Sequence, residues 1–120
     1  MDITKYQTWV EANYYAQRSL AYTTIALAGE VGEYANLVKK YMRMHETDDT
    51  QREAYNKYTQ GKDQIVTKER LMDELGDVLH YIMSNCIVLG ISVDDIIKMI
   101  VDKINQRRAV GGLPVIELKK

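Results

Sequence analysis

The sequence predicts an all-α fold: one four-helix domain over residues 1–120 that is completed by oligomerisation. Among the 120 residues the one proline is Pro114, so nothing breaks the helices before that point. The Asn-Gly and Asp-Gly pairs that mark β-hairpins are absent from the sequence. Apolar residues recur at helical spacing through most of the chain, and their broad faces argue against a monomer.

Two helices are expected in the first third of the chain. The first covers residues 3 to about 18, and Asp2 or Thr4 is its cap. The second runs from residue 19 or 20 to 44, with Ser19 as a suitable cap and basic side chains at its end. Both carry a continuous apolar stripe, so each should pack one face against the rest of the domain.

A polar insertion at about residues 46–67 separates the two halves of the predicted bundle. A polar link of this length is unusual inside a compact domain. One interpretation is a lid, in which Tyr55, Tyr58 and neighbouring basic side chains close over an anionic ligand. The other is a solvated loop that contains one helical turn.

The last two helices are the best delimited. The third covers about residues 68–89 and ends at Gly90, which suits a left-handed cap. The fourth covers about residues 93–108 and begins with a capping box at Ser92. After a glycine and proline break, residues 115–120 are expected to form a short strand or an arm over a partner.

Two pairs of acidic residues, each three positions apart, lie inside apolar stretches of the second and third helices. Residues at this spacing are neighbours on one helix face, so each pair holds two like charges together. Carboxylates on an inward face are rarely ionised unless they are paired or bind a metal. Two such pairs facing each other would form an oxygen cage suited to Mg²⁺ or Mn²⁺. The four acids are Glu30, Glu33, Glu74 and Asp77.

Three glycines accompany these acids: Gly29, Gly32 and Gly76. A glycine inside a helix costs about 1 kcal/mol relative to alanine. The structural reason to accept that cost is close approach of another backbone. The functional reason is room for a ligand, and the two reasons are compatible.

The composition of the chain argues against a nucleic-acid polymer or a membrane as its partner. The formal net charge of −1 provides no basic field of the kind that holds a nucleic-acid polymer. The single Cys86 allows no intrachain disulfide and suits a reducing compartment. No signal peptide begins the sequence, and its longest apolar run is too short to span a bilayer. We therefore expect a cytoplasmic protein without a membrane partner.

The acidic cage favours metal-assisted phosphoryl chemistry. Mg²⁺ is usually shared among carboxylates, waters and substrate phosphates. Such a cation offsets phosphate charge while a bound water attacks phosphorus. The sequence contains no GxxxxGK phosphate loop and no serine–histidine or cysteine–histidine constellation that would indicate another chemistry.

The motif LAGEVGE at residues 27–33, followed by ELGDVL at 74–79, resembles the MazG-like all-α nucleoside triphosphate pyrophosphohydrolases. This family also includes dimeric dUTPases and dCTP pyrophosphatases, and its pattern is ExxE followed by ExxD. The resemblance extends over roughly residues 19–108 and implies a MazG-like four-helix bundle. It implies hydrolysis of an NTP or dNTP between the α and β phosphates, which gives a monophosphate and pyrophosphate.

The resemblance also implies roles for individual residues. The four acids would hold Mg²⁺, with Mn²⁺ as a substitute, and one acid would orient the water. Substrate contacts are implied at four further positions: Tyr81, Lys103, Asn105 and Arg108. Members of the family form homodimers or homotetramers with active sites near subunit interfaces.

Two features depart from the family pattern. The gap of 40 residues between Glu33 and Glu74 exceeds that of the compact members, which leaves the substrate undefined. His80 stands where the family often has tryptophan or another bulky residue. It is interpreted as a helix-face histidine packed beside the core.

The acidic pairs and the helical fold allow three interpretations other than a metal-dependent hydrolase. The acids could be exposed and paired with basic residues, such as Arg70 with Glu74, but that would leave the costly glycines unexplained. A di-iron bundle normally requires two Glu-x-x-His motifs, whereas this chain offers only Asp77 to His80. A non-catalytic dimerisation or regulatory module with the same fold is the remaining alternative.

Overall fold

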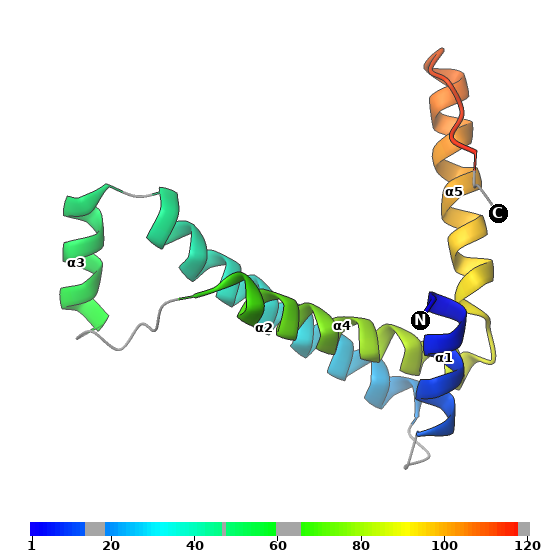
Figure 1. The fold of residues 1–120 in the computed structure, drawn as a ribbon, viewed down its shortest axis with the longest axis horizontal. Coiled ribbons are helices and arrows are strands. Elements are labelled where there is room, and N and C mark those ends of the chain that lie inside the picture. The colour runs from blue at the N-terminus through cyan, green and yellow to red at the C-terminus, as the bar shows by residue number, and fades with distance from the viewer. Residues whose placement is uncertain (14–18, 47, 60–65, 118–120) are drawn as a thin grey trace. The chain divides into compact units, whose positions relative to one another are not determined.

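The computed structural model describes residues 1–13, 19–46, 48–59 and 66–117. Within these ranges the secondary structure is entirely helical, which confirms the predicted all-α class (Figure 1). The described helices are α1 (Ile3–Ala12), α2 (Leu20–Glu46), α3 (Asp49–Thr59), α4 (Lys68–Leu89) and α5 (Val93–Val110). Among the described residues, no helix is both long and apolar enough to cross a bilayer.

The chain divides into two compact units. One contains residues 1–18 and 83–120, and the other contains residues 19–82. The long helix α4 contributes its last turns to the first unit and its earlier turns to the second.

The first unit has a small apolar core beneath α1. Val10, Met83, Cys86 and Val93 are buried there, and Tyr6 packs against them. Burial of such side chains stabilises the fold by about 1.5–3 kcal/mol each. This core joins α1 to the end of α4 and the start of α5.

Gln7 strengthens the same junction with its side-chain amide. Its Nε2 donates to the carbonyl of Ile91 at 2.9 Å, and its Oε1 accepts from the backbone N–H of Val93 at 2.7 Å. One side chain of α1 therefore satisfies two backbone groups at the α4–α5 turn, and one of them, the N–H of Val93, is left unpaired by the start of α5.

The turn at Gly90 is the left-handed cap that the sequence predicted. Gly90 has a φ of 67°, and the N–H of Ile91 donates to the carbonyl of Cys86 at 3.0 Å. This is the bond pattern of a Schellman motif. Ser92 then caps α5, because its hydroxyl accepts from the N–H of Asp94 at 3.2 Å.

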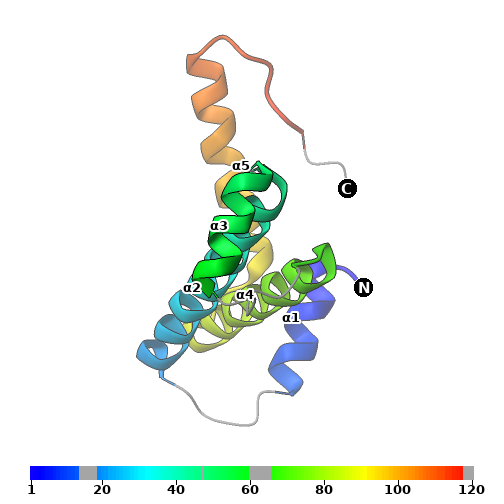
Figure 2. The same ribbon diagram turned by 90° about the vertical axis from the view of Figure 1, so that its left-hand side faces the viewer.

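In the second unit, α2 and the early turns of α4 run antiparallel, and both views show them side by side (Figures 1 and 2). The N–H of Val66, just before α4, lies 3.3 Å from the sulfur of Met44, near the end of α2. Leu37 and Val66 are buried in this unit, as is Thr23. Ser19 caps α2 as predicted, accepting from the N–H of Tyr22 at 3.1 Å.

The predicted end of the first helix is wrong. The first helix ends at Ala12 rather than near residue 18, because the side chain of Asn13 donates to the carbonyl of Trp9 at 2.8 Å. Such a local bond competes with continuation of the helix. Residues 14–18 lie outside the described part of the chain.

The polar insertion holds more helix than the single turn predicted for a solvated loop. Helix α3 spans 11 residues within it. Asp48 caps this helix by accepting from the N–H of Gln51 at 2.8 Å, and Asp49 pairs with Arg52 at 2.6 Å. The side chains of Tyr55 and Tyr58, named in the lid hypothesis, lie outside the described part of the structure.

Candidate metal centre

The acidic pairs of α2 and α4 meet inside the second unit. Glu30 and Glu33 are one turn apart on α2, and Glu74 reaches them from α4. Each of the three residues offers a carboxylate oxygen, and these oxygens all lie within 4.8 Å of one another. The structure thus brings together three of the four acids that the sequence predicted, at a spacing at which one small cation can contact all of them.

Two of these carboxylates are partly withdrawn from solvent. Oε2 of Glu30 and Oε2 of Glu74 are buried, and no described residue gives either oxygen a hydrogen-bond partner. A buried acceptor without a partner is unfavourable, since it has lost its water without replacement. The donor set is made only of oxygens, which suits a hard cation such as Mg²⁺ or Mn²⁺. Both observations fit a metal site.

The electrostatics of the group agree with its geometry. Burial and the negative charges of Glu33 and Asp77 raise the pKa of Glu30 above its usual value. The same causes raise the pKa of Glu74, with a further contribution from Asp73. A bound divalent cation would offset this repulsion.

Asp77, the fourth predicted ligand, lies outside the group of three. It is exposed on α4, one turn after Glu74. Its charge nevertheless raises the pKa of both Glu30 and Glu74. Asp77 is therefore near enough to contribute to the field of the site.

The glycines of both motifs have open surroundings. A Cβ placed at Gly29, Gly32 or Gly76 would meet no described atom within 4 Å beyond its own helix backbone and chain neighbours. Close approach of another backbone within the described chain therefore does not explain them. Room for a ligand or for a second subunit is the explanation that remains.

Two further residues of α4, Cys86 and His80, were predicted from the sequence to have structural rather than catalytic roles. Cys86 is buried, and burial raises the pKa of its thiol, so it packs as a small apolar side chain. His80 is half-buried, and its ring makes an edge contact with Tyr81 at a centroid distance of 5.1 Å.

The predicted substrate contacts fall in both units. Tyr81 is half-buried on α4, one turn after Asp77, in the unit that holds the acids. Lys103, Asn105 and Arg108 lie on α5 in the other unit, and Lys103 is exposed.

Two of the α5 residues bind the segment that follows their own helix. We call residues 113–117 the strap. The side chain of Asn105 donates to the carbonyl of Ile116 and accepts from its N–H, both at 2.7 Å. Nε of Arg108 donates to the carbonyl of Pro114 at 2.6 Å. A strand or an arm was expected over residues 115–120. Residues 115–117 are neither helix nor strand, and residues 118–120 lie outside the described part of the chain.

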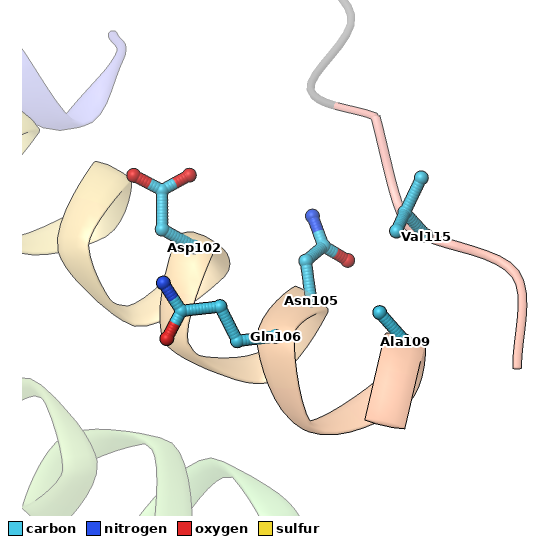
Figure 3. A pocket seen from close by; sticks show the side chains of 5 residues that line it. All are labelled: Asp102, Asn105, Gln106, Ala109 and Val115. Carbon is cyan, nitrogen blue, oxygen red and sulfur yellow. The ribbon is translucent and has the colours of Figure 1, made fainter. Parts of the chain in front are cut away.

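A hollow of about 340 Å³ lies between α5 and the strap. Figure 3 shows the side chains that line it, four from α5 and Val115 from the strap. They are Asp102, Asn105, Gln106, Ala109 and Val115. Sequence reasoning did not anticipate these contacts. The signal available was the Gly111-Gly112 pair, which allows the chain to reverse, followed by Pro114, which prevents further helix.

Comparison with known proteins identifies the family. The family model for the MazG nucleotide pyrophosphohydrolase domain matches residues 18–110. The chain belongs to the MazG family. The match includes α2, the acidic motifs and α5, and this family membership confirms the resemblance drawn from the sequence.

The MazG chain is also similar to the Gene 37 protein of Mycobacterium phage L5. The two are 30% identical over 95 residues, which is 77% of this chain and 68% of the phage protein. No solved structure matches the chain. Membership of the family indicates a hydrolase that acts on nucleotides.

Proposed function

We propose that this MazG protein is a Mg²⁺-dependent pyrophosphohydrolase that cleaves an NTP or dNTP between its α and β phosphates. The observation that carries the proposal is the convergence of Glu30, Glu33 and Glu74 from two helices, with two buried oxygens lacking partners. The ExxE and ExxD spacing within a matched MazG domain supports the same reaction.

The four acids of the two motifs would hold Mg²⁺, or Mn²⁺ in its place: three of their carboxylates converge, and Asp77 lies one turn after Glu74. When bound, the cation would offset the charge of the substrate phosphates. In this assignment Glu30, Glu33 and Glu74 position the triphosphate by way of the metal rather than by direct contact.

The same carboxylates are the available proton acceptors. One of them would orient a water so that its oxygen bonds to phosphorus as the P–O bond to the bridging oxygen breaks. The proton of the water passes to the carboxylate, and pyrophosphate and a nucleoside monophosphate leave.

Substrate contacts beyond the phosphates are proposed on two helices. Tyr81 on α4 and Lys103, Asn105 and Arg108 on α5 would contact the nucleotide. The basic side chains suit phosphates, and the amide of Asn105 offers both a donor and an acceptor.

We further propose that the protein acts as a homodimer or homotetramer in the cytoplasm. Support for assembly comes from large apolar side chains that the described chain leaves exposed, among them Ile25 at 72%, Met72 at 69% and Met99 at 73%. Exposed apolar side chains that gather into a continuous patch typically mark a protein–protein interface. The lone Cys86 suits a reducing compartment.

The reaction is tested by product analysis. Purified protein is incubated with each canonical NTP and dNTP, and with dUTP, in Mg²⁺, and the products are separated by chromatography. Glu33→Gln removes one carboxylate of the group, and Glu69→Gln removes an exposed carboxylate from the first turn of α4 as a matched control.

Monophosphate and pyrophosphate from wild type and Glu69→Gln, but not from Glu33→Gln, are the expected result. Diphosphate and phosphate would retain the metal site but contradict α–β cleavage. Absence of turnover with every nucleotide would favour the non-catalytic module with the same fold.

A further inference from the structure

We propose that the strap, residues 113–117, is an internal competitor of the substrate, which must displace it to reach Asn105 and Arg108. This inference rests on the proposed function, because it assumes that these two side chains contact the nucleotide. It concerns α5 and the segment after it, both of which lie in one unit of the structure.

The strap returns along α5 because the helix ends in a reversal. Gly112 has a φ of 73°, which favours glycine, and the N–H of Leu113 donates to the carbonyl of Arg108 at 2.8 Å. The N–H of Gly112 donates to the carbonyl of Ala109 at 3.1 Å, which completes a Schellman motif. The reversal carries Pro114 and Ile116 back beside the last turns of α5.

The strap occupies the polar groups that would otherwise be open to a ligand. The amide of Asn105 engages one residue, Ile116, with its donor and its acceptor at once. A side-chain amide binds the edge of a nucleobase in the same two-point manner. The guanidinium of Arg108 is a natural phosphate ligand, and its Nε donates a hydrogen bond to the carbonyl of Pro114.

The strap is also weakly held. Val115 and Ile116 remain 56% and 51% exposed, so their side chains gain little from docking. The hollow of Figure 3 separates part of the strap from α5. Beyond the reversal at Leu113, the contact depends on three exposed side-chain hydrogen bonds, each worth about 2- to 10-fold in population. A ligand that satisfies the same groups can displace it.

The competition is tested at the N–H of Ile116. Ile116→Pro removes the donor to Asn105 and leaves Asn105 and Arg108 intact. Ile116→Val is the matched control, because it trims the side chain and keeps the N–H. The Michaelis constant of each protein is measured with the best nucleotide of the product panel. Hydrogen exchange at the Ile116 amide is followed in wild type, with Mg²⁺ and a non-hydrolysable α,β-methylene triphosphate.

We expect Ile116→Pro to lower KM about 2- to 10-fold with kcat little changed, because a larger fraction of the molecules is competent to bind. We expect Ile116→Val to match wild type, and the triphosphate to accelerate exchange at Ile116. An unchanged KM in Ile116→Pro, or exchange that slows when the triphosphate binds, would overturn the strap proposal and leave the hydrolase standing. Absence of turnover and of triphosphate binding in all three proteins would overturn both.

Discussion

At the scale of single residues, the candidate site holds several carboxylates close together, and a bound cation would offset their mutual repulsion. Glu30 and Glu74 each keep a buried carboxylate oxygen without a hydrogen-bond partner among the described residues. Burial and neighbouring acids raise the pKa of both groups. The chain thus holds like charges together at a cost to its own stability, an arrangement typical of functional sites.

The first prediction concerns the pH dependence of the metal-free protein. Both pKa values lie above 4.5 in the folded state, so the contribution of these groups is fully present below pH 4.5 and is lost as the pH rises through the raised values. Thermal unfolding in a chelator should therefore show a decline in stability as the pH rises above the ordinary glutamate pKa of about 4.3. The double variant Glu30→Gln, Glu74→Gln should show a smaller decline, and an identical pH profile in the two proteins would contradict the assignment.

The acids were predictable from sequence because their spacing alone fixes which residues share a helix face. The sequence did not reveal that Asp77 lies outside the group of three, because that depends on the rotation of α4 against α2. Nor did it reveal that Asn105 binds Ile116, since such a contact depends on the path of an irregular segment.

At the scale of helices, caps and turns determine where each element ends. Asp2, Ser19 and Ser92 begin their helices as the sequence predicted, and Gly90 ends α4. The errors were an early stop at Asn13 and a full helix in the polar insertion. The stop at Asn13 depends on a local side-chain hydrogen bond, and the polar insertion lacks the apolar periodicity on which sequence reading depends.

The open space beside Gly32 leads to a prediction about α2. Gly32→Ala should stabilise the protein by about 0.5–1 kcal/mol, because no described atom obstructs a Cβ at this position. Gly32→Leu should stay folded and lose turnover if the space admits a ligand. Thermal unfolding and kcat/KM measure the two effects. Full activity in Gly32→Leu would refute the explanation that Gly32 leaves room for a ligand. A large loss of stability in this variant would instead support close packing of another backbone against Gly32.

The amide of Gln7 gives a prediction about the α4–α5 junction. Gln7→Ala removes both hydrogen bonds to this turn and should cost about 1–3 kcal/mol of stability. Denaturant unfolding provides the measurement. Lys5→Ala, on the same helix, is the control, since the Lys5 side chain is exposed. Equal stability of the two variants would show that Gln7 does not tie α1 to the turn.

At the scale of the whole molecule, the described chain leaves much apolar surface in water. Three large side chains, Ile25, Met72 and Met99, are each more than two-thirds exposed. Among the described residues few side chains are fully buried, and two of these, Val10 and Met83, belong to the core of the first unit. Copies of the chain are expected to cover the remaining surface, as the broad apolar stripes in the sequence predicted.

Light scattering coupled to size-exclusion chromatography tests this expectation. The mass should be two or four times that of one chain. Met99→Lys, which places a charge on an exposed apolar position of α5, should shift the mass toward the monomer if this face is an interface. A monomeric wild type at micromolar concentration would contradict the expected assembly.

Mn²⁺ binding followed by electron paramagnetic resonance shows directly whether Glu30, Glu33 and Glu74 together bind a divalent cation. Wild type and the control Glu69→Gln should bind with equal affinity, whereas Glu74→Gln should bind at least about tenfold more weakly. The Glu74→Gln protein should remain folded without metal, because the substitution relieves repulsion within the group. Equal Mn²⁺ affinity in Glu74→Gln and wild type would contradict binding by all three acids.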